Sequence, residues 1–484
     1  AMMSQQLKYD YKKLYIGGQL AHAEGENSRT HYCPGTDKPV ANIAWAKRSD
    51  TQRALEEAEE GFRVWSNMSL VTRLDWIEKL RDTLVKNEVL LRESVMDEMG
   101  KVWEGTLEDF KSITDSLRYY AEEIQKREDI PIEDLEGTHS HYIKQQPLGV
   151  VVAFLAYNFP LLNLGFKLGP ALAAGCSIII KPSEFSPLSA YLIGELCKEI
   201  NFPRGVINIL CGDVQEVGVP LCESTIPSLI TMIGSTETAQ KLIQQSSKTS
   251  IKRYGMECGG NAPFIIFEDS DFDKALDIGY ALKIGNSGQI CVAANRFLVQ
   301  KPIFEKYANA LVKKFKAVAV GFGRENNPDM GPLANEQSVK KVKDFVDKAV
   351  AQGGKVLSGG NSLNRPGNYF EPTVIVMHDT EAKVLQEEVF GPVALLLPFE
   401  TKEEALHISN AVDVGLASYV FSNNKETLEF FANKLEFGEV QLNGVKYDIY
   451  LPHGGIKNSG IGVDCSTYAL DDYLIRKRVS LALE

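Results

Sequence analysis

One cysteine in the chain has the surroundings that a catalytic thiol needs. Cys291 ends the turn-prone stretch 285–291, which contains two glycines shortly before the thiol. Glycine allows close backbone approach, so a substrate could reach this sulfur, and a thiolate must reach a carbonyl carbon to attack it. A cysteine in such a turn is more often an inert apolar residue. The hypothesis of a nucleophile therefore depends on the groups that surround Cys291.

Two further side chains could support chemistry at a thiol. Asn158 follows the apolar run 149–155, and its amide could stabilise an oxyanion, although an asparagine in a turn is common. Glu257 stands beside the glycine pair 259–260. In a dry pocket its pKa would rise and it could act as a general base, whereas a glutamate in a loop is usually just solvated.

Two strand ends carry residues that suit a dinucleotide. Gly234 and Ser235 form a strand-to-helix turn that could bind phosphate, although a full GxGxxG is missing and an ordinary helix start explains the turn equally well. Lys181 and Glu184 follow another strand, where they could hold a ribose or form a surface ion pair. A carboxylate at position 184 would repel a 2′-phosphate, which favours NAD and leaves NADP possible.

The elements that must position these residues alternate between strand and helix. Apolar, β-branched segments separated by helical patterns predict a doubly wound parallel sheet whose ligands bind at the carboxyl ends of the strands. A helical region, about 49–125, precedes them, and a second α/β region follows at about 263–443. The alternating segment 129–147 predicts a surface hairpin or an assembly arm. The predicted strands of the first sheet are 149–155, 177–180, 206–210 and 228–233.

Composition limits the class of protein. With 484 residues the chain is expected to form two or three domains, and its net charge of −12 argues against nucleic-acid and anionic-membrane partners. Eight scattered cysteines without CxxC predict reduced thiols in the cytoplasm, and seven histidines without HExxH predict no metal site. The polar start, 1–6, does not read as a signal peptide, and no apolar run approaches the length of a membrane span.

Taken together, in this order and at these spacings, the motifs resemble the aldehyde dehydrogenase superfamily over nearly the whole chain. The resemblance implies that Cys291 is the nucleophile, that Asn158 forms the oxyanion hole and that Glu257 activates the deacylating water. It also implies Asp464 as a second acid for proton relay. The matching segments are 158–160, 181–184, 234–237, 257–260, 288–291, 388–392 and 454–460.

The same resemblance implies the cofactor and the architecture. We expect a Rossmann-type NAD-binding domain at 1–125 and 148–259 and an α/β catalytic domain at 260–450. A β oligomerisation arm is expected at 126–147 and 465–484, in a homodimer or homotetramer. NAD, with NADP possible, would be held by Lys181, Ser183, Glu184, Gly234, Ser235, Glu388 and Phe390.

The substrate is expected to be a small aldehyde, either a semialdehyde or a hydroxyaldehyde. Residues 259–264 and 455–457 are most similar to succinate-semialdehyde dehydrogenases, but the two arginines that such enzymes use to bind a carboxylate are replaced here by Phe166 and Gly285. Residues 286–289 and His453 are similar to lactaldehyde-type dehydrogenases. Candidate substrate contacts are Tyr157, Lys446 and His453.

Three other functions compete with hydrolytic aldehyde oxidation. In a CoA-acylating dehydrogenase a thiol would intercept the thioester, and the retained Glu257 argues against this function. A non-catalytic structural protein on the same scaffold is disfavoured by the intact set of Cys291, Glu257 and Asn158. A cofactor-free thiol hydrolase is disfavoured because no histidine lies within any of these motifs.

Overall fold

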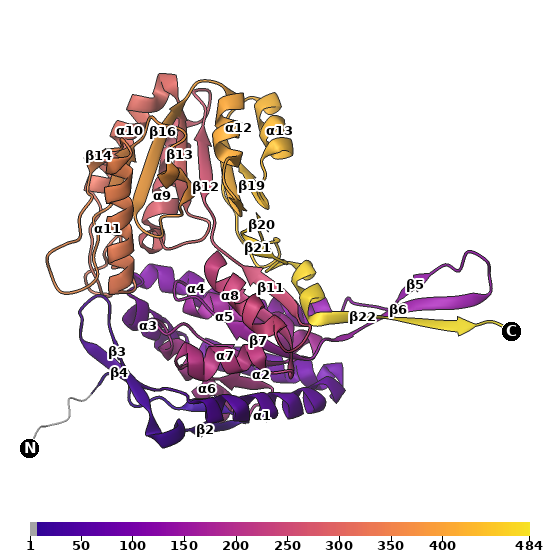
Figure 1. Ribbon diagram of the computed structural model, residues 1–484. Coiled ribbons are helices and arrows are strands. Elements are labelled where there is room, and N and C mark those ends of the chain that lie inside the picture. Colours follow the sequence, from indigo (N-terminus) through magenta and orange to yellow (C-terminus); the bar gives the residue numbers. More distant parts are fainter. Residues whose placement is uncertain (1–6) are drawn as a thin grey trace, which may run out of the picture.

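A computed structural model describes residues 7–484 as two α/β bodies, one above the other, with a long arm that projects from the side (Figure 1). The first body contains the N-terminal half of the chain, and the second contains most of the remainder. The polar segment 1–6 lies outside the described residues. Within residues 7–484 no helix is both long enough and apolar enough to cross a membrane.

An eight-stranded sheet forms the centre of the first body. Its strand order is β2-β1-β9-β8-β7-β10-β11-β21, and the five strands from β9 to β11 are parallel. These parallel strands confirm the predicted α/β class. The bounds are β1 (Leu14–Ile16), β2 (Gln19–Ala21), β7 (Val150–Phe154), β8 (Ser177–Lys181), β9 (Ile207–Ile209), β10 (Pro227–Ile233), β11 (Arg253–Glu257) and β21 (Gly460–Ile461).

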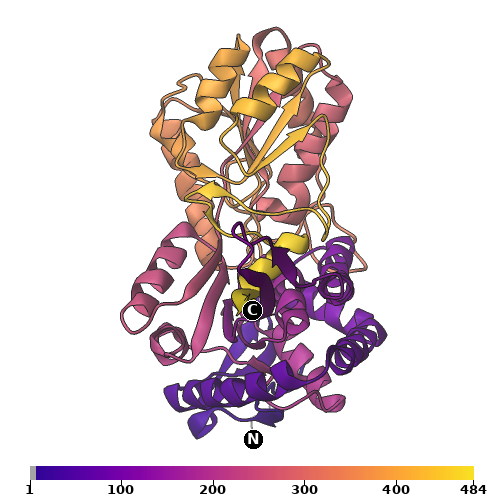
Figure 2. The ribbon, with the colours of Figure 1, turned by 90° about the vertical axis from the view of Figure 1, so that its right-hand side faces the viewer.

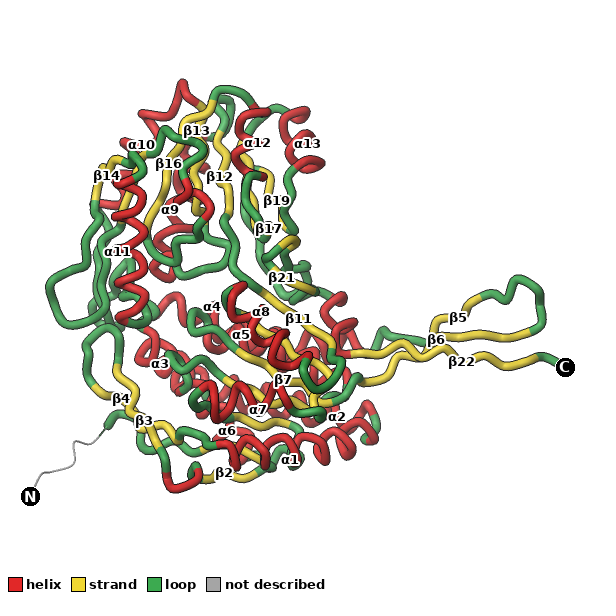
Figure 3. Tube along the Cα trace, in the orientation of Figure 1, coloured by secondary structure: helices red, strands yellow, loops and turns green. Residues whose placement is uncertain are grey.

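Helices cover both faces of this sheet (Figure 3). Within the predicted helical region of about 49–125, the chain breaks between α2 and α3 at Asn87, which ends one helix and begins the next. The helices are α1 (Arg48–Asn67), α2 (Leu70–Lys86), α3 (Glu88–Met99), α4 (Trp103–Ile124), α5 (Pro160–Ala174), α6 (Leu188–Glu199), α7 (Val219–Glu223) and α8 (Thr236–Ser247).

Small residues bring α4 and α5 unusually close together. A Cβ atom on Gly165 would lie 2.6 Å from the Cα atom of Ile113, and one on Gly169 would collide with the hydroxyl of Ser116. The Ser116 hydroxyl instead donates to the carbonyl of Gly165 at 2.6 Å. This packing fixes the position of α5, whose first turn follows Asn158.

A seven-stranded sheet forms the second body, in the order β14-β15-β16-β13-β12-β18-β19, and only β14 runs antiparallel to its neighbour. Its strands are β12 (Ala262–Ile266), β13 (Ala294–Gln300), β14 (Lys355–Ser358), β15 (Thr373–Val376), β16 (Val393–Phe399), β18 (Ala417–Phe421) and β19 (Glu439–Leu442). Its helices are α9 (Phe272–Ile284), α10 (Lys301–Lys316), α11 (Glu336–Ala351), α12 (Lys402–Asn410) and α13 (Lys425–Lys434).

Two short ribbons complete the fold: β3 (Ser28–Tyr32) with β4 (Pro39–Ala44), and β17 (Val414–Gly415) with β20 (Ile456–Lys457).

The projecting arm is a three-stranded antiparallel sheet, seen end-on in Figure 2. It consists of β5 (Ile130–Ile132), β6 (His139–Pro147) and the C-terminal strand β22 (Leu474–Ala482). Strand β22 pairs with β6 along its whole length, so segments more than 300 residues apart in sequence form one element. Apolar side chains on the arm, including Leu135 and Leu481, are exposed. Its role in assembly and the domain boundaries stay predictions.

A short return of the chain joins the two bodies at the edge of the first sheet. Strand β21 pairs with the end of β11, so that Gly460 lies opposite Glu257. Gly460 has φ +141°, and a Cβ atom there would collide with the carbonyl oxygen of Met256. Only glycine fits this approach, which fixes the end of the strand that carries Glu257.

Candidate active site

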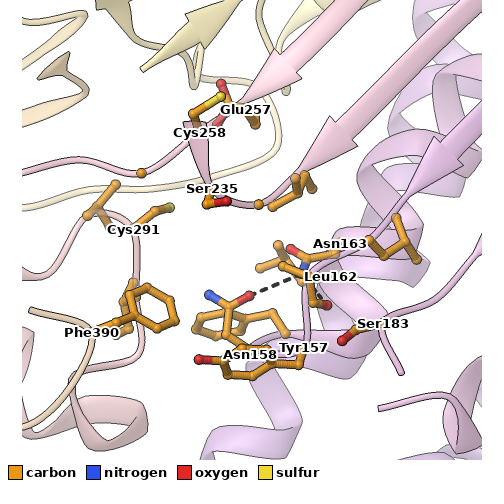
Figure 4. A pocket seen from close by; sticks show the side chains of 18 of the residues that line it. Tyr157, Asn158, Leu162, Asn163, Ser183, Ser235, Glu257, Cys258, Cys291 and Phe390 are labelled. Carbon is orange, nitrogen blue, oxygen red and sulfur yellow. Dashed lines mark hydrogen bonds between the residues drawn. The ribbon is translucent and has the colours of Figure 1, made fainter. Parts of the chain in front are cut away.

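A cavity of about 1400 Å³ lies where the two bodies meet. The carboxyl ends of β7, β8, β10 and β11 open into it, as do α4, α5, α11 and the segments 290–292, 387–390 and 447–453. Figure 4 shows side chains of both bodies facing this hollow, with Cys291 and Phe390 opposite Tyr157 and Asn158. Ligand sites of open parallel sheets lie at this edge.

The loop before Cys291 is held in an uncommon conformation. Asn286, Ser287 and Gly288 have φ of 53°, 57° and 76°, and a Cβ atom on Gly288 would collide with the carbonyl of Gly391. Such left-handed backbone persists in non-glycine residues only where the surroundings enforce it. The loop places Cys291 on the cavity wall, half-buried, whereas the other seven cysteines are buried.

Asn158, in the first body, forms hydrogen bonds with the loop before Cys291. Its Nδ2 donates to the carbonyl of Gln289 at 3.1 Å, and its Oδ1 accepts from Nδ2 of Asn163 at 3.2 Å (Figure 4). Its own carbonyl accepts from Nδ2 of Asn286 at 3.0 Å. The amide nitrogen is therefore directed toward the Cys291 loop, as an oxyanion donor would be.

The helix after Asn158 is anchored by a buried carboxylate. Oδ1 of Asp109, on α4, accepts from the backbone N–H of Leu162 at 2.9 Å, and Oδ2 accepts from that of Leu161 at 3.3 Å. These N–H groups are otherwise unpaired in the first turn of a helix, and a carboxylate is favourable there. Asp109 lies outside the recognised motifs, and no sequence pattern indicates its role.

Glu257 ends β11 and faces the cavity. Its Oε2 lies 3.1 Å from Nε2 of His453, and its buried Oε1 accepts no hydrogen bond from residues 7–484. Burial raises the pKa of Glu257 to about 6, with the charge of His453 opposing the rise. Above that pH the side chain is a carboxylate with one oxygen ready to accept a proton.

His453 lies between the thiol and two carboxylates. Its Nε2 is 4.0 Å from Sγ of Cys291, and its Nδ1 is 2.7 Å from Oε2 of Glu439. No histidine lies within the recognised motifs, but His453 directly precedes the glycine pair 454–455, and the turn there folds back onto the thiol. Glu439, on β19, was missed, because it belongs to no motif and its distance from His453 cannot be inferred from sequence.

Asp464 lines the cavity, but both of its oxygens pair with Nζ of Lys167, at 2.9 and 3.2 Å. Both side chains of this pair are nearly fully buried. Among the described residues, Glu257 hydrogen-bonds to His453 and not to Asp464. Lys167 is a second residue that sequence reasoning missed.

The residues expected to hold a ribose lie together after β8. Lys181, Ser183 and Glu184 line one end of the cavity, and Nη1 of Arg29 lies 3.3 Å from Oε2 of Glu184. The guanidinium of Arg29 also lies over the ring of Trp45, 4.8 Å from its centre. Arg29 was not predicted, since it comes from the N-terminal ribbon.

The expected pyrophosphate turn lies at the same end. Gly234 and Ser235 line the cavity, and Ser235 caps α8 by accepting from the N–H of Thr238 at 3.1 Å. Free N–H groups and the positive end of the helix dipole favour an anion at such a turn.

Glu388 and Phe390 stand between this end and Cys291. Oε2 of Glu388 accepts from the N–H of Gly260 at 2.8 Å, and burial raises its pKa to about 7. The Phe390 ring lies edge-to-face with that of Tyr157, 6.1 Å between centres. Tyr157, expected as a substrate contact, thus packs against a residue expected to bind cofactor.

Lys446 does not reach the cavity. Its side chain is exposed, and its ammonium lies 5.7 Å from the ring centre of Tyr450. Phe166, by contrast, lines the cavity. No arginine is among the cavity-lining residues in the described part of the chain.

The cavity thus combines a thiol, an amide and a buried carboxylate at the carboxyl ends of parallel strands. The aldehyde dehydrogenase family model matches residues 21–479, and the chain belongs to this family. The succinate-semialdehyde dehydrogenase, mitochondrial, of Oryza sativa is 36% identical over 467 residues, which cover 96% of this chain and 88% of that protein. The glutarate-semialdehyde dehydrogenase of Pseudomonas putida is 32% identical over 473 residues, 98% of each chain.

A solved structure shares the whole architecture. The crystal structure of betaine aldehyde dehydrogenase from Staphylococcus aureus in complex with NAD⁺ has a TM-score of 0.94 and 32% identity, and the match covers 97% of this chain and 95% of that one. The likeness confirms the predicted fold class and the family.

Replacing Asn158 by alanine removes the amide donor and should lower kcat/KM for aldehyde oxidation by about 10²- to 10³-fold, as loss of an oxyanion donor does elsewhere. The measurement is initial-rate kinetics on purified variants. An Asn423→Ala variant, changed at an exposed residue just before α13, is the matched control. An unchanged kcat/KM in Asn158→Ala would show that the Asn158 amide does not stabilise the oxyanion.

Proposed function

We propose that this protein oxidises a small aldehyde to the carboxylic acid with NAD, through a thioester on Cys291. The observation that carries the proposal is the convergence of Cys291, Asn158 and Glu257 on one cavity, each from a different element. Thiol attack needs a nucleophile, an oxyanion donor and a base for the second half of the reaction, and these three residues supply them.

The residues of the cavity fit a nicotinamide dinucleotide. Lys181 and Glu184 would hold the adenosine ribose, and the N-terminal turn of α8 would hold the pyrophosphate. Glu388 would hold the nicotinamide ribose, and a Cβ atom on Gly259 would lie 2.6 Å from its Oε1, so a larger residue at 259 would displace this carboxylate. When bound, the nicotinamide ring supplies the hydride acceptor.

The protein's own residues then act in order. The Cys291 thiolate attacks the aldehyde carbon, and Nδ2 of Asn158 donates to the oxygen that becomes negative. Loss of hydride leaves a thioester on Cys291. The free Oε1 of Glu257 accepts a proton from water, whose oxygen attacks the thioester carbon and releases the acid. Transfer of the acyl group to CoA would not require such an activated water, so Glu257 argues against the CoA-acylating alternative.

The lining favours a neutral or hydroxylated aldehyde over a dicarboxylic semialdehyde. Phe166 occupies a position where a carboxylate-binding arginine is expected in succinate-semialdehyde dehydrogenases, and it lines the cavity. The part of the lining that α4 contributes includes the acidic residues Glu104, Glu108 and Asp115, with Lys111 as its one cation. This surplus of negative charge opposes a second carboxylate on the substrate.

The arm, with its exposed apolar side chains, would join copies of the chain into a homodimer or homotetramer in the cytoplasm.

Initial rates of NADH formation with a panel of aldehydes test the proposed function. The panel contains succinate semialdehyde, lactaldehyde, glycolaldehyde, propanal and benzaldehyde, each with NAD or NADP and with or without CoA. We expect turnover without CoA and a higher kcat/KM for the neutral and hydroxylated aldehydes. A clear preference for succinate semialdehyde would contradict the substrate class, and strict dependence on CoA would contradict hydrolysis.

Glu184→Gln should increase the use of NADP relative to NAD, because it removes the charge that would face a 2′-phosphate and leaves Arg29 without its carboxylate partner. The readout is the ratio of kcat/KM for the two cofactors with one aldehyde. Glu237→Gln, which changes an exposed carboxylate of α8 paired with Lys241, is the control for a simple loss of charge near the cavity. An unchanged ratio in Glu184→Gln would show that Glu184 does not belong to the ribose site.

A further inference from the structure

The contact between Cys291 and His453 has a geometry that aldehyde oxidation alone does not require. Nε2 of His453 lies 4.0 Å from Sγ of Cys291, and Nδ1 lies 2.7 Å from Oε2 of Glu439. The same Nε2 lies 3.1 Å from Oε2 of Glu257, so the imidazole stands between two carboxylates with the thiol beside it. A positively charged histidine next to a cysteine stabilises the thiolate.

Glu439 is held firmly enough to orient the ring. Its Oε2 also accepts from the N–H of Gly454 at 3.1 Å, and its Oε1 accepts from the hydroxyl of Tyr447 at 3.0 Å. The side chain is only 9% exposed. A carboxylate with both oxygens engaged cannot turn away, so the Nδ1–H of His453 is fixed toward Glu439 and Nε2 is fixed toward the cavity.

The two carboxylates beside His453 favour the positively charged form of its ring. Burial lowers the pKa of His453, but the attraction of Glu257 and Glu439 and the contact with Cys291 raise it well above its ordinary value. Burial raises the pKa of the Cys291 thiol, and the hydrogen bond and charge of His453 oppose that rise. The ionisable groups that face His453 are Glu257 from β11, Glu439 from β19, Cys291, Tyr419 from β18, Tyr447, and Asp464 and Cys465 from the final loop.

Given that Cys291 is the nucleophile of the proposed function, we propose that His453, positioned by Glu439, stabilises the Cys291 thiolate before any cofactor binds. The S–H bond breaks, its proton passes to solvent, and the electron pair that stays on sulfur is held against the imidazolium. The enzyme would thus hold a reactive thiol in its cofactor-free state. The role of His453 is electrostatic and separate from any contact with the substrate.

The thiolate fraction of Cys291 can be measured without aldehyde or cofactor. Full-length protein is treated with iodoacetamide from about pH 5 to about pH 10, and the alkylation rate of the Cys291 peptide is followed by mass spectrometry. Because the other seven cysteines are buried, the signal at Cys291 is separable from theirs. We expect the half-maximal pH of the His453→Asn variant to lie at least about one unit above that of wild type, with alkylation near neutral pH slowed about tenfold.

Two variants distinguish this role from a structural one. Glu439→Gln keeps the histidine but removes the carboxylate that holds its proton, so it should shift the profile in the same direction by a smaller amount. His407→Asn, on the exposed face of α12, is the matched control and should leave the profile unchanged. Should His453→Asn fail to fold, as judged by circular dichroism, Glu439→Gln decides the question alone.

Glu257→Gln separates His453 from the other possible base. Glu257 stabilises the charged imidazole as Glu439 does, but it also opposes the thiolate, so we expect this variant to shift the profile less than His453→Asn does. A shift in Glu257→Gln larger than that in His453→Asn would show that the carboxylate ionises the thiol and would overturn the proposal. Profiles of His453→Asn and Glu439→Gln that coincide with wild type would also overturn it. A failure of aldehyde oxidation would be seen separately, as absence of NADH formation in wild type, and would leave the alkylation profiles interpretable.

Discussion

The structure depends on a small set of amide hydrogen bonds that join its two α/β bodies at the cavity. Asn158 follows β7 of the first body, and the 286–289 segment follows α9 of the second. The bond from Asn158 to Gln289 and that from Asn286 to Asn158 connect them directly, at 3.1 and 3.0 Å. Because Asn158 is buried, leaving its amide unpaired would cost about 1–3 kcal/mol. The same bonds that hold the bodies together therefore direct an amide nitrogen toward the thiol.

A second constraint is the concentration of ionisable groups in a dry site. Glu257, Glu388 and His453 all line the cavity, and burial acts on the pKa of each. Burial disfavours the charged form of any one group, so neighbours of opposite charge decide which groups stay ionised. One oxygen of Glu257 pairs with His453, which holds the side chain in place. The other oxygen accepts no hydrogen bond from residues 7–484 and is therefore available to act as a base.

The sequence predicts the fold well because the local signals agree with the global arrangement. Buried parallel strands such as 149–155 and 228–233 are continuous apolar runs, and the residues at their ends reach one cavity by the geometry of the sheet. Asn158, Cys291 and Glu257 were accessible to prediction for this reason. The break between α2 and α3 at Asn87 was not accessible to prediction, because the helical periodicity continues across it.

Contacts between distant segments escaped prediction for a physical reason. Glu439 and His453 are 14 residues apart and meet only because β19 and the following loop pack against β11 and the Cys291 turn. Lys167 and Asp464 are 297 residues apart. Pairings of this kind follow from tertiary packing and not from local pattern, and here they include the groups that set the charge of the site.

The most direct test of the account is to trap the acyl group on Cys291. Wild type and Glu257→Gln are mixed with NAD and a good aldehyde, quenched in acid, and the Cys291 peptide is weighed. Since the pKa of Glu257 is raised to about 6, acyl-enzyme should accumulate in wild type as the pH falls through that value, and at every pH in Glu257→Gln. An acyl group on any other residue, or no acyl-enzyme in Glu257→Gln although NADH is formed, would contradict the account.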